Sequence, residues 1–305
     1  MRDPAGRSLL LEHPPYRAQI VTVGATLRSL ARDGLDLVAG FPAGQRCTDY
    51  RGWVLVPWPN RIADGRYHHG GTAHQLPITE VERHNALHGL VGWLPWTVTE
   101  LDVRRARLTL ELAPQDGYDG CLDVAVTYQL GDDGLSVTLE ATNRGSAAAP
   151  YGAGHHPYLT VGRHIDECEL SLPAAAFAPL DERGRPSAAR SVSGTELDFR
   201  GSRLIGSTVI DQPFTELDRV DGWATATLRD PGSGRAVQLH ADPTFGWLQV
   251  FTADTHGDRA RDSLAVEPMT CPPDAFNSGT DLVVLAPGEA HRAAYRLGGV
   301  SASAS

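Results

Sequence analysis

The chain has 305 residues and a formal net charge of −10, with 37 acidic side chains against 27 basic ones. Every basic residue is arginine, and the sequence contains no lysine. This composition excludes a lysine Schiff base and a P-loop, because both need a lysine. An acidic chain without clustered positive charge is also unsuited to general nucleic-acid binding. The absence of lysine fits an Arg-, Ala- and Gly-rich composition of the kind a GC-rich genome produces.

No apolar stretch comes close to the ~18 residues that a membrane span requires, and the first residues lack the apolar core of a signal peptide. We therefore expect a cytoplasmic protein that binds neither membranes nor nucleic acid. The four cysteines are widely scattered, at Cys47, Cys121, Cys168 and Cys271. Their spacing predicts reduced, mostly buried thiols rather than a disulfide framework or a zinc knuckle.

Short segments with alternating apolar and polar side chains run through most of the chain, which is typical of half-buried strands. They are 18–23, 35–39, 107–112, 122–128, 135–141, 224–228 and 236–240. Two pairs of these segments are separated by Gly-containing turns and predict hairpins, the first turn being Gly131–Gly134. Helical patterns are interrupted by 32 glycines and 21 prolines. The sequence therefore predicts an all-β, antiparallel sandwich or barrel.

No interior linker or internal repeat divides this pattern. We expect a single catalytic domain over residues 1–298 and a disordered tail at 299–305, where serine and alanine alternate at the very end. The polar, Arg- and Pro-containing stretch at 181–196 is expected to be a surface loop.

Four segments carry polar residues in Gly- and Pro-rich contexts that a plain strand does not need, and loops on a rigid β scaffold often carry function. They are Val56–Ile62, Asn85–Gly89, Tyr151–Tyr158 and Ala265–Asn277. In the first, prolines hold the backbone around a tryptophan, and the planar guanidinium of Arg61 suits recognition of hydroxyl or carboxyl oxygens. A surface arginine beside a core tryptophan is the alternative interpretation.

Three of these segments contain side chains suited to proton transfer. Glu267 ends an apolar strand before a proline-rich loop, where a carboxylate can act as a general base or be satisfied by loop amides. His155 and His156 are adjacent, and adjacent side chains on a strand point in opposite directions. The pair is therefore a poor chelator, and we expect acid–base chemistry with no metal. His88 stands before a glycine, where its ring can face a site or serve the structure alone.

Taken in chain order, five pieces of the sequence resemble the aldose 1-epimerase (galactose mutarotase-like) family. They are Pro57–Ile62, Asn85–Gly89, Gly154–Tyr158, Val209–Thr215, and Glu267–Thr270 with Asp274–Asn277, so the resemblance extends over positions 20–297. Galactose mutarotases often have an aromatic residue where this chain has Leu159. In this feature, and in the Pro-Met-Thr after Glu267, the chain is more similar to a bacterial mutarotase-like branch. The genes of that branch often lie near sugar catabolic genes, including those of sulfosugar pathways.

The resemblance implies a large antiparallel β-sandwich, the galactose mutarotase-like supersandwich, that interconverts the α and β anomers of a free aldohexose without a metal or organic cofactor. In the matching motifs, Glu267 would be the base on the C1 hydroxyl, His156 the acid on the ring oxygen, and His88 a helper at either oxygen. The residues that would bind sugar hydroxyls are Asn60, Arg61 and Asp211. We expect a small-molecule monosaccharide as the partner, and a monomer or a homodimer.

Ring opening removes a proton from the C1 hydroxyl and adds one to the ring oxygen, so the site needs one base and one acid with pKa values near the working pH. We therefore expect burial to raise the pKa of Glu267 and a nearby charge to keep His156 protonated.

Three other functions remain open from the sequence. A hexose-6-phosphate mutarotase would need a cationic cluster for the phosphate, for which Arg104–Arg105 or Arg259 with Arg261 are candidates, and a sulfosugar mutarotase is a related alternative. A glycoside hydrolase would pair two carboxylates across the bond, here Asp211 and Glu267. A non-catalytic sugar-binding protein could use the same scaffold.

Overall fold

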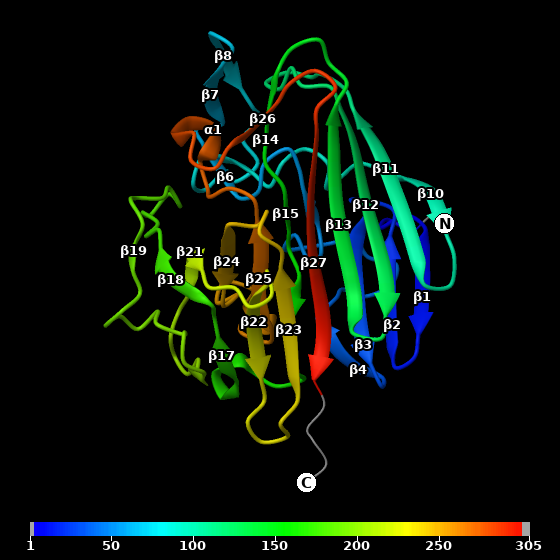
Figure 1. Ribbon diagram of the computed structural model, residues 1–305, viewed down its shortest axis with the longest axis vertical. Helices are drawn as coiled ribbons and strands as arrows, with labels where there is room; N and C mark the ends of the chain where they lie inside the picture. The colour runs from blue at the N-terminus through cyan, green and yellow to red at the C-terminus, as the bar shows by residue number, and fades with distance from the viewer. Residues whose placement is uncertain (1–2, 301–305) are drawn as a thin grey trace.

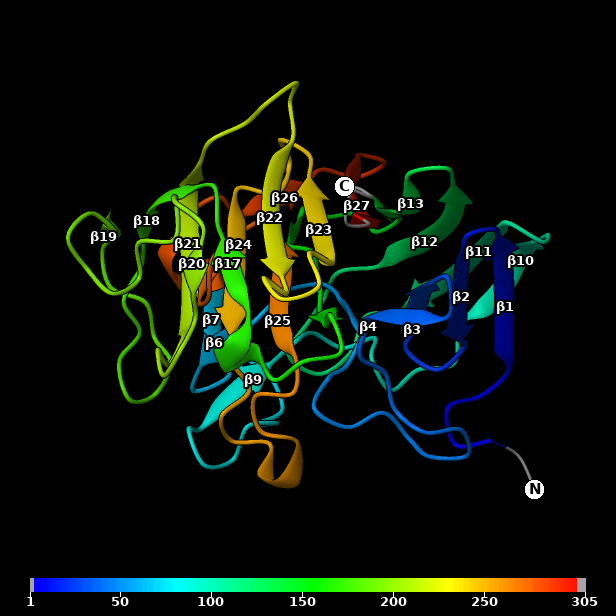
Figure 2. The same ribbon diagram turned by 90° about the horizontal axis from the view of Figure 1, so that it is seen from below.

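A computed structural model describes residues 3–300 and confirms the predicted all-β, antiparallel fold. Two large sheets contain most of the strands (Figure 1). Seen from below, the sheets lie one over the other (Figure 2). Each sheet has one face turned to the other sheet, so the arrangement is a β-sandwich with its main core between the layers.

The first sheet has twelve strands. Its main path runs β1-β2-β3-β4-β16-β25-β24-β21-β18-β19, and β15 joins it by pairing with both β25 and β5. Its strands are β1 (Ser8–His13), β2 (Tyr16–Val21), β3 (Thr26–Arg32), β4 (Leu35–Val38), β5 (Val54–Leu55), β15 (Gly154–His155), β16 (Tyr158–Leu159), β18 (Ala174–Phe177), β19 (Arg190–Ser191), β21 (Asp211–Leu217), β24 (Trp247–Phe251) and β25 (Leu264–Met269).

The second sheet has nine strands in the order β10-β11-β12-β13-β27-β23-β22-β17-β20. They are β10 (Thr97–Leu101), β11 (Arg105–Leu112), β12 (Leu122–Gly131), β13 (Gly134–Asn143), β17 (Glu169–Ser171), β20 (Arg203–Leu204), β22 (Ala224–Arg229), β23 (Ala236–Ala241) and β27 (Ala290–Val300).

Three two-stranded ladders and three short helical turns complete the described chain. The ladders are β6 (Arg61–Ala63) with β9 (Asn85–Leu87), β7 (Arg66–His69) with β8 (Thr72–Gln75), and β14 (Ala149–Tyr151) with β26 (Val283–Leu285). The helical turns are η1 (Ile165–Glu167), η2 (Gly257–Arg259) and α1 (Ala275–Ser278). Across residues 3–300, no helix is long and apolar enough to cross a membrane.

Both predicted hairpins form. In the first, β12 pairs with β13 and the ladder closes at Gly131 opposite Gly134, so the turn itself is Asp132–Asp133. Gly134 has a φ of +118°, and a β-carbon there would lie 2.1 Å from the Leu297 carbonyl oxygen on β27. The glycine is therefore required both by the turn and by the close approach of a neighbouring strand.

The strand alternation of β25 places its side chains on two different faces. Leu264 and Val266 belong to the main core between the sheets. Ala265 and Met269 belong to two small apolar clusters apart from it. Glu267 is on the same face as these two residues, because side chains two positions apart on a strand share a face. The twelve-stranded sheet thus presents Glu267 on its outer face, away from the main core.

The predicted boundary of the C-terminal tail is too early. β27 continues through Gly299 and Val300, which pair with Val237 and Ala236 of β23. These ladder contacts make 299–300 part of the sheet. The remaining tail residues, 301–305, lie outside the described part of the chain.

Candidate active site

The centre of the candidate site is Glu267 on the outer face of the twelve-stranded sheet. Its carboxylate is 2 % exposed although it does not face the main core. Gln249 on β24 is its register partner, so the two side chains stand next to each other on that face. Connecting segments that cover this face bring in the other polar groups.

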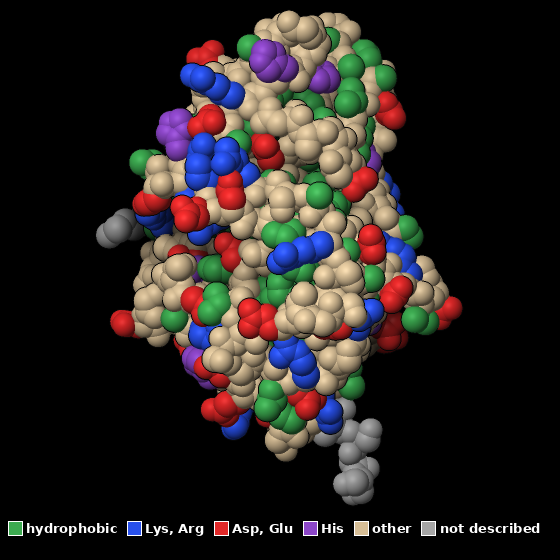
Figure 3. Space-filling view, turned by 90° about the vertical axis from the view of Figure 1, so that its left-hand side faces the viewer, with side chains coloured by type: hydrophobic (Ala, Val, Ile, Leu, Met, Phe, Trp, Pro, Cys, Tyr) green, Lys and Arg blue, Asp and Glu red, His purple; other side chains and the backbone are tan. Residues whose placement is uncertain are grey.

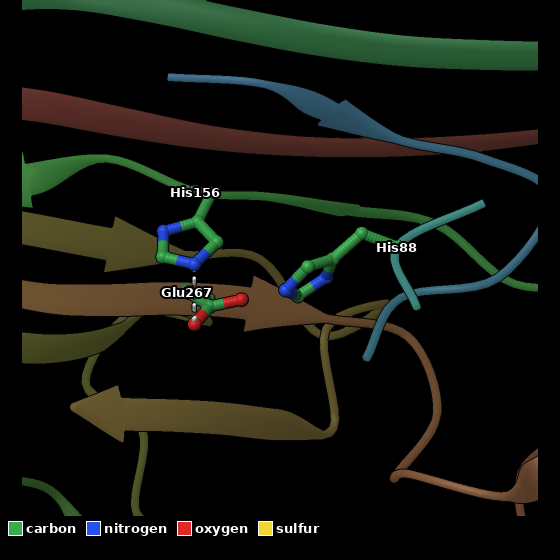
Figure 4. Close-up of side chains that lie close together, drawn as sticks. All are labelled: His88, His156 and Glu267. Carbon is green, nitrogen blue, oxygen red and sulfur yellow. Dashed lines mark ion pairs between the residues drawn. The ribbon is translucent and has the colours of Figure 1, made fainter. Parts of the chain in front are cut away.

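The two adjacent histidines turn in opposite directions, as predicted. His155 points into the core, where its two ring nitrogens lie 3.1 Å from the Tyr128 hydroxyl and 2.7 Å from the Tyr295 hydroxyl. His156 points outward, and its Nε2 lies 3.2 Å from Oε1 of Glu267 (Figure 4). One histidine is therefore structural, and the other is paired with the candidate base.

His88 approaches the pair from the loop that follows β9. Its ring centroid lies 5.2 Å from that of His156 in an edge-on arrangement, and both rings point toward Glu267 (Figure 4). Nδ1 of His88 accepts the backbone N–H of Asn60 at 3.2 Å. That bond assigns the ring proton of the neutral imidazole to Nε2, which makes His88 a hydrogen-bond donor toward the site.

The site geometry needs Gly89 directly after His88. Gly89 has a φ of +74°, and a β-carbon there would lie 2.1 Å from the Val56 carbonyl oxygen. Only a glycine lets the two chain segments approach this closely, so the His-Gly dipeptide places the imidazole.

Burial controls the ionisation of all three groups, since His88, His156 and Glu267 are 5 %, 3 % and 2 % exposed. Burial raises the pKa of the Glu267 carboxyl well above its usual value, and the nearby charge of Asp211 raises it further. The predicted rise is confirmed in direction. Burial lowers the pKa of His156 to about 3 and that of His88 well below its usual value.

The expectation that a nearby charge keeps His156 protonated is wrong for the free protein. Loss of water around the buried ring is the largest effect on its pKa, and the positive charge of Arg51 also disfavours the imidazolium. The two opposite shifts favour the neutral form of each side chain. Transfer of a carboxyl proton from Glu267 to His156 across the 3.2 Å contact would give a carboxylate and an imidazolium without any change in net charge.

The same three side chains are the one group within residues 3–300 with the composition and spacing of a metal site. Their ligand atoms lie within 4.8 Å of one another, and two imidazoles with a carboxylate are a known zinc set. However, Nε2 of His156 and Oε1 of Glu267 face each other directly at 3.2 Å. A metal ion would have to separate them, whereas proton transfer uses the contact as it stands.

Arg61 lies beside the trio in a tight ion pair. Its guanidinium donates to both carboxylate oxygens of Glu80, at 2.9 Å and 3.2 Å from Nε and at 3.0 Å from the outer nitrogen. It also donates to the side-chain oxygen of Asn60 at 3.1 Å. Glu80 and Asn60 thereby hold the guanidinium plane in one orientation, which suits a group that must present fixed donors to a ligand.

Asp211 begins β21 and is connected to the trio through Gln249. The Gln249 amide donates to Asp211 at 2.7 Å, while its own carbonyl oxygen is buried without a hydrogen-bond partner in the structure. Arg83 lies 3.5 Å from the second oxygen of Asp211. The structure thus brings all six predicted site residues to one region.

The loop predicted at 181–196 is more than a polar surface segment. Its Gly184 is buried with a φ of +75°, and a β-carbon there would lie 2.6 Å from Nε of Arg61. Arg183 ties the loop down through an ion pair with Asp64 at 2.7 Å and through its carbonyl oxygen, which accepts from Asn85 at 2.8 Å. The loop therefore covers the guanidinium of Arg61.

The arginines considered for a phosphate-binding cluster are largely occupied by carboxylates. Arg105 pairs with Glu100 at 2.8 Å, and Arg259 pairs with Asp49 at 2.9 Å. Arg261 lies between two carboxylates, those of Asp166 and Asp254. The same mixing of charges is visible on the face in Figure 3, where arginines lie next to acidic side chains.

Three residues at the site were not predicted. Glu80 gives no signal in the sequence, because it is one acid in a charged stretch and its partner is nineteen positions away. Gln249 could have been found, since it is a lone polar side chain amid the apolar residues of β24. Tyr50 lies 4.7 Å from His88 between ring centroids, and nothing in its local pattern predicts this contact.

The fold is shared with solved sugar-epimerase structures. An aldose epimerase homologue from C. elegans superposes with a TM-score of 0.86 at 20 % identity, over 97 % of this chain and 99 % of that one. Galactose 1-epimerase from Lactobacillus acidophilus superposes with a TM-score of 0.82 at 22 % identity, over 96 % and 94 %. These likenesses identify the class of fold as the galactose mutarotase-like β-sandwich.

Sequence comparison gives the family. The family model described as aldose 1-epimerase matches residues 7–298. Uncharacterized protein YihR of Escherichia coli is 39 % identical over 97 % of this chain and 94 % of its own length. Mouse galactose mutarotase is 28 % identical over 77 % of this chain and 74 % of its own. The chain belongs to the aldose 1-epimerase family, and its relatives support a sugar epimerase or mutarotase activity.

Proposed function

We propose that the protein is a mutarotase that interconverts the α and β anomers of a free aldohexose by opening and closing the sugar ring. The observation that carries this proposal is the buried contact of 3.2 Å between Nε2 of His156 and Oε1 of Glu267, with pKa values shifted in opposite directions. Such a pair can supply an acid and a base at the same time without adding net charge to a dry site.

The proposed reaction needs only proton transfers. Once a carboxyl proton has moved from Glu267 to His156, the Glu267 carboxylate removes the proton of the C1 hydroxyl, the C1–O bond to the ring oxygen breaks, and the oxygen at C1 forms a carbonyl. His156 gives its proton to the ring oxygen. After rotation about the C1–C2 bond, the ring oxygen attacks the other face of the carbonyl and both transfers reverse.

The remaining site residues are assigned to binding and orientation. His88 donates from Nε2 to the ring oxygen or to the oxygen at C1, since its Nδ1 is occupied by Asn60. Arg61, Asn60 and Asp211 bind sugar hydroxyls. Arg61 keeps free N–H groups beyond those that it gives to Glu80 and Asn60, so it can still donate to a ligand.

The test is polarimetry of freshly dissolved α-anomers, with glucose and galactose as the first substrates. We expect catalysed mutarotation that survives a chelator, since the proposed chemistry uses no metal. Hexose 6-phosphates and 6-sulfonated hexoses are assayed in the same way to identify the substrate. A methyl glycoside should be inert, and its hydrolysis would favour a glycosidase instead. Sugar binding without any catalysed mutarotation would make the protein a non-catalytic binder.

A further inference from the structure

Tyr50 borders both imidazoles of the candidate site, although the proposed chemistry does not use it. Its ring lies 4.7 Å from that of His88 at a tilt of 57°. It lies 6.3 Å from that of His156 and nearly parallel to it, at 22°. The ring is half-buried, whereas both histidines are almost completely covered. Tyr50 therefore stands between the buried acid–base groups and the solvent.

The backbone adopts an unfavourable conformation to place this ring. Asp49 and Tyr50 have φ angles of +57° and +56°, so two consecutive residues with side chains occupy the left-handed region. Gly52 follows with a φ of +71°. The left-handed conformation is uncommon for residues other than glycine, asparagine and aspartate, and such residues cluster at functional sites. A bulky tyrosine held in this conformation is therefore a candidate for a functional role.

The turn is fastened on both sides of Tyr50. The Asp49 carboxylate pairs with Arg259 at 2.9 Å, and the Asp49 carbonyl oxygen accepts the Tyr158 hydroxyl at 3.1 Å. On the other side, the backbone N–H of Gly52 donates to the carbonyl oxygen of His156 at 2.8 Å. These contacts connect the turn to the chain segment that carries His156, so the ring position is fixed relative to the acid–base pair.

We propose that Tyr50 is a further sugar-binding residue, whose ring packs against the C–H face of the bound pyranose and selects sugars by that face. This inference rests on the proposed function. A sugar whose C1 hydroxyl and ring oxygen reach Glu267 and His156 must lie beside both imidazoles, and Tyr50 already borders both. The electron-rich face of an aromatic ring attracts the weakly positive C–H groups of a sugar. A hydroxyl that projects axially from that face would collide with the ring.

The test compares Tyr50→Phe, Tyr50→Leu and Tyr50→Ala in mutarotation of glucose and galactose, which differ at one axial hydroxyl. We expect KM close to the wild-type value for Phe, higher for Leu, and about 10-fold higher for Ala, the loss that one aromatic contact produces. We expect kcat to change far less, because the ring does not transfer protons. The ratio of KM values for the two sugars should also shift, which a merely structural role would not cause.

Trp93→Ala is the matched control. Trp93 is an exposed aromatic residue that packs edge-on against Trp53, 4.4 Å between ring centroids, while Trp53 in turn contacts Tyr50 at 5.2 Å. Its truncation should leave KM unchanged. If Tyr50→Ala does not fold, the test relies on comparing KM of Tyr50→Leu with KM of Tyr50→Phe. Unchanged KM in a folded Leu or Ala variant, or a loss in kcat alone, would overturn the proposal.

Failure of this inference can be separated from failure of the proposed function. Sugar affinity is also measured by calorimetry in the Glu267→Gln background, where catalysed turnover is strongly reduced. If the wild-type enzyme is active and KM is unaltered in the Tyr50 variants, the tyrosine contact is rejected and the mutarotase activity is supported. If the wild-type protein is inactive but its sugar affinity falls when Tyr50 is truncated, the mutarotase activity is rejected and the contact is supported.

Discussion

At the residue scale, the proposed activity depends on proton transfer by Glu267 and His156. Glu267→Gln keeps the size of the side chain and removes the base, and His156→Asn removes the acid. We expect each substitution to lower kcat by about 10²–10⁴-fold, the typical contribution of one general acid or base, with the fold retained. Polarimetry measures the rate, and circular dichroism checks the fold. The exposed His68→Gln serves as the control. Near-wild-type rates for either Glu267→Gln or His156→Asn would refute the assignment.

The residues of this pair could be predicted from the sequence, but their ionisation could not. The opposite directions of His155 and His156 follow from strand geometry, which is local. The charge on His156 depends on how completely other segments cover the outer face of the sheet. That cover comes from residues such as Tyr50 and Tyr158, whose rings lie nearly parallel to the imidazole with centroids 6.3 Å and 4.9 Å away. No local pattern reports it, and the prediction of a protonated ring failed for that reason.

At the element scale, the loop at 181–196 offers a matched pair of glycines. Gly184 and Gly194 both have a φ of +75°, but a β-carbon at Gly184 would collide with Arg61, whereas one at Gly194 would meet nothing within 4 Å. Gly184→Ala should push the loop or the guanidinium aside and raise KM several-fold. Gly194→Ala has the same backbone strain and should leave KM unchanged. Equal KM values in steady-state kinetics would show that the loop does not position Arg61.

The elements that could be predicted are those whose partners are close in sequence. The hairpin of β12 and β13 is encoded by alternation and a Gly-containing turn within one continuous stretch. The packing of Gly184 on Arg61 joins positions more than a hundred residues apart. Short strands such as β5 and β16 were also missed, because two residues cannot establish a period. Long-range contacts of this kind are decided by the assembled sheets.

At the scale of the whole molecule, the sandwich separates stability from chemistry. The main core lies between the sheets, and the groups proposed to transfer protons lie on the outer face of one sheet, where loops enclose them. Neutral histidines are buried on both sides of that sheet: His155 inside, and His88 and His156 outside. Burial lowers the pKa of each of them. Folding is therefore linked to pH through groups in both regions.

This linkage predicts loss of stability in acid. Burial lowers the pKa of His155 to about 3, against about 6.5 in an unfolded chain. A group with a lowered pKa contributes stability that is fully present above pH 6.5 and is lost as the pH falls toward 3. The reason is that in this range the unfolded chain binds a proton that the folded chain does not bind. Protonation of His156 destabilises the fold in the same way, because its pKa is also lowered. The raised pKa of Glu267 has the opposite effect, since its contribution to the stability of the fold increases as the pH falls.

His155 is therefore the clean probe of this effect. Its contribution to the unfolding free energy should fall by up to about 1.4 kcal/mol per pH unit between about pH 6.5 and pH 3. His155→Gln keeps a polar side chain between Tyr128 and Tyr295 and cannot bind the proton. Denaturant unfolding at pH 7, 6, 5 and 4 should show a shallower decline for this variant, whatever its absolute stability. His68→Gln, at an exposed position, should keep the wild-type slope. An unchanged slope in His155→Gln would mean that the acid sensitivity comes from other groups.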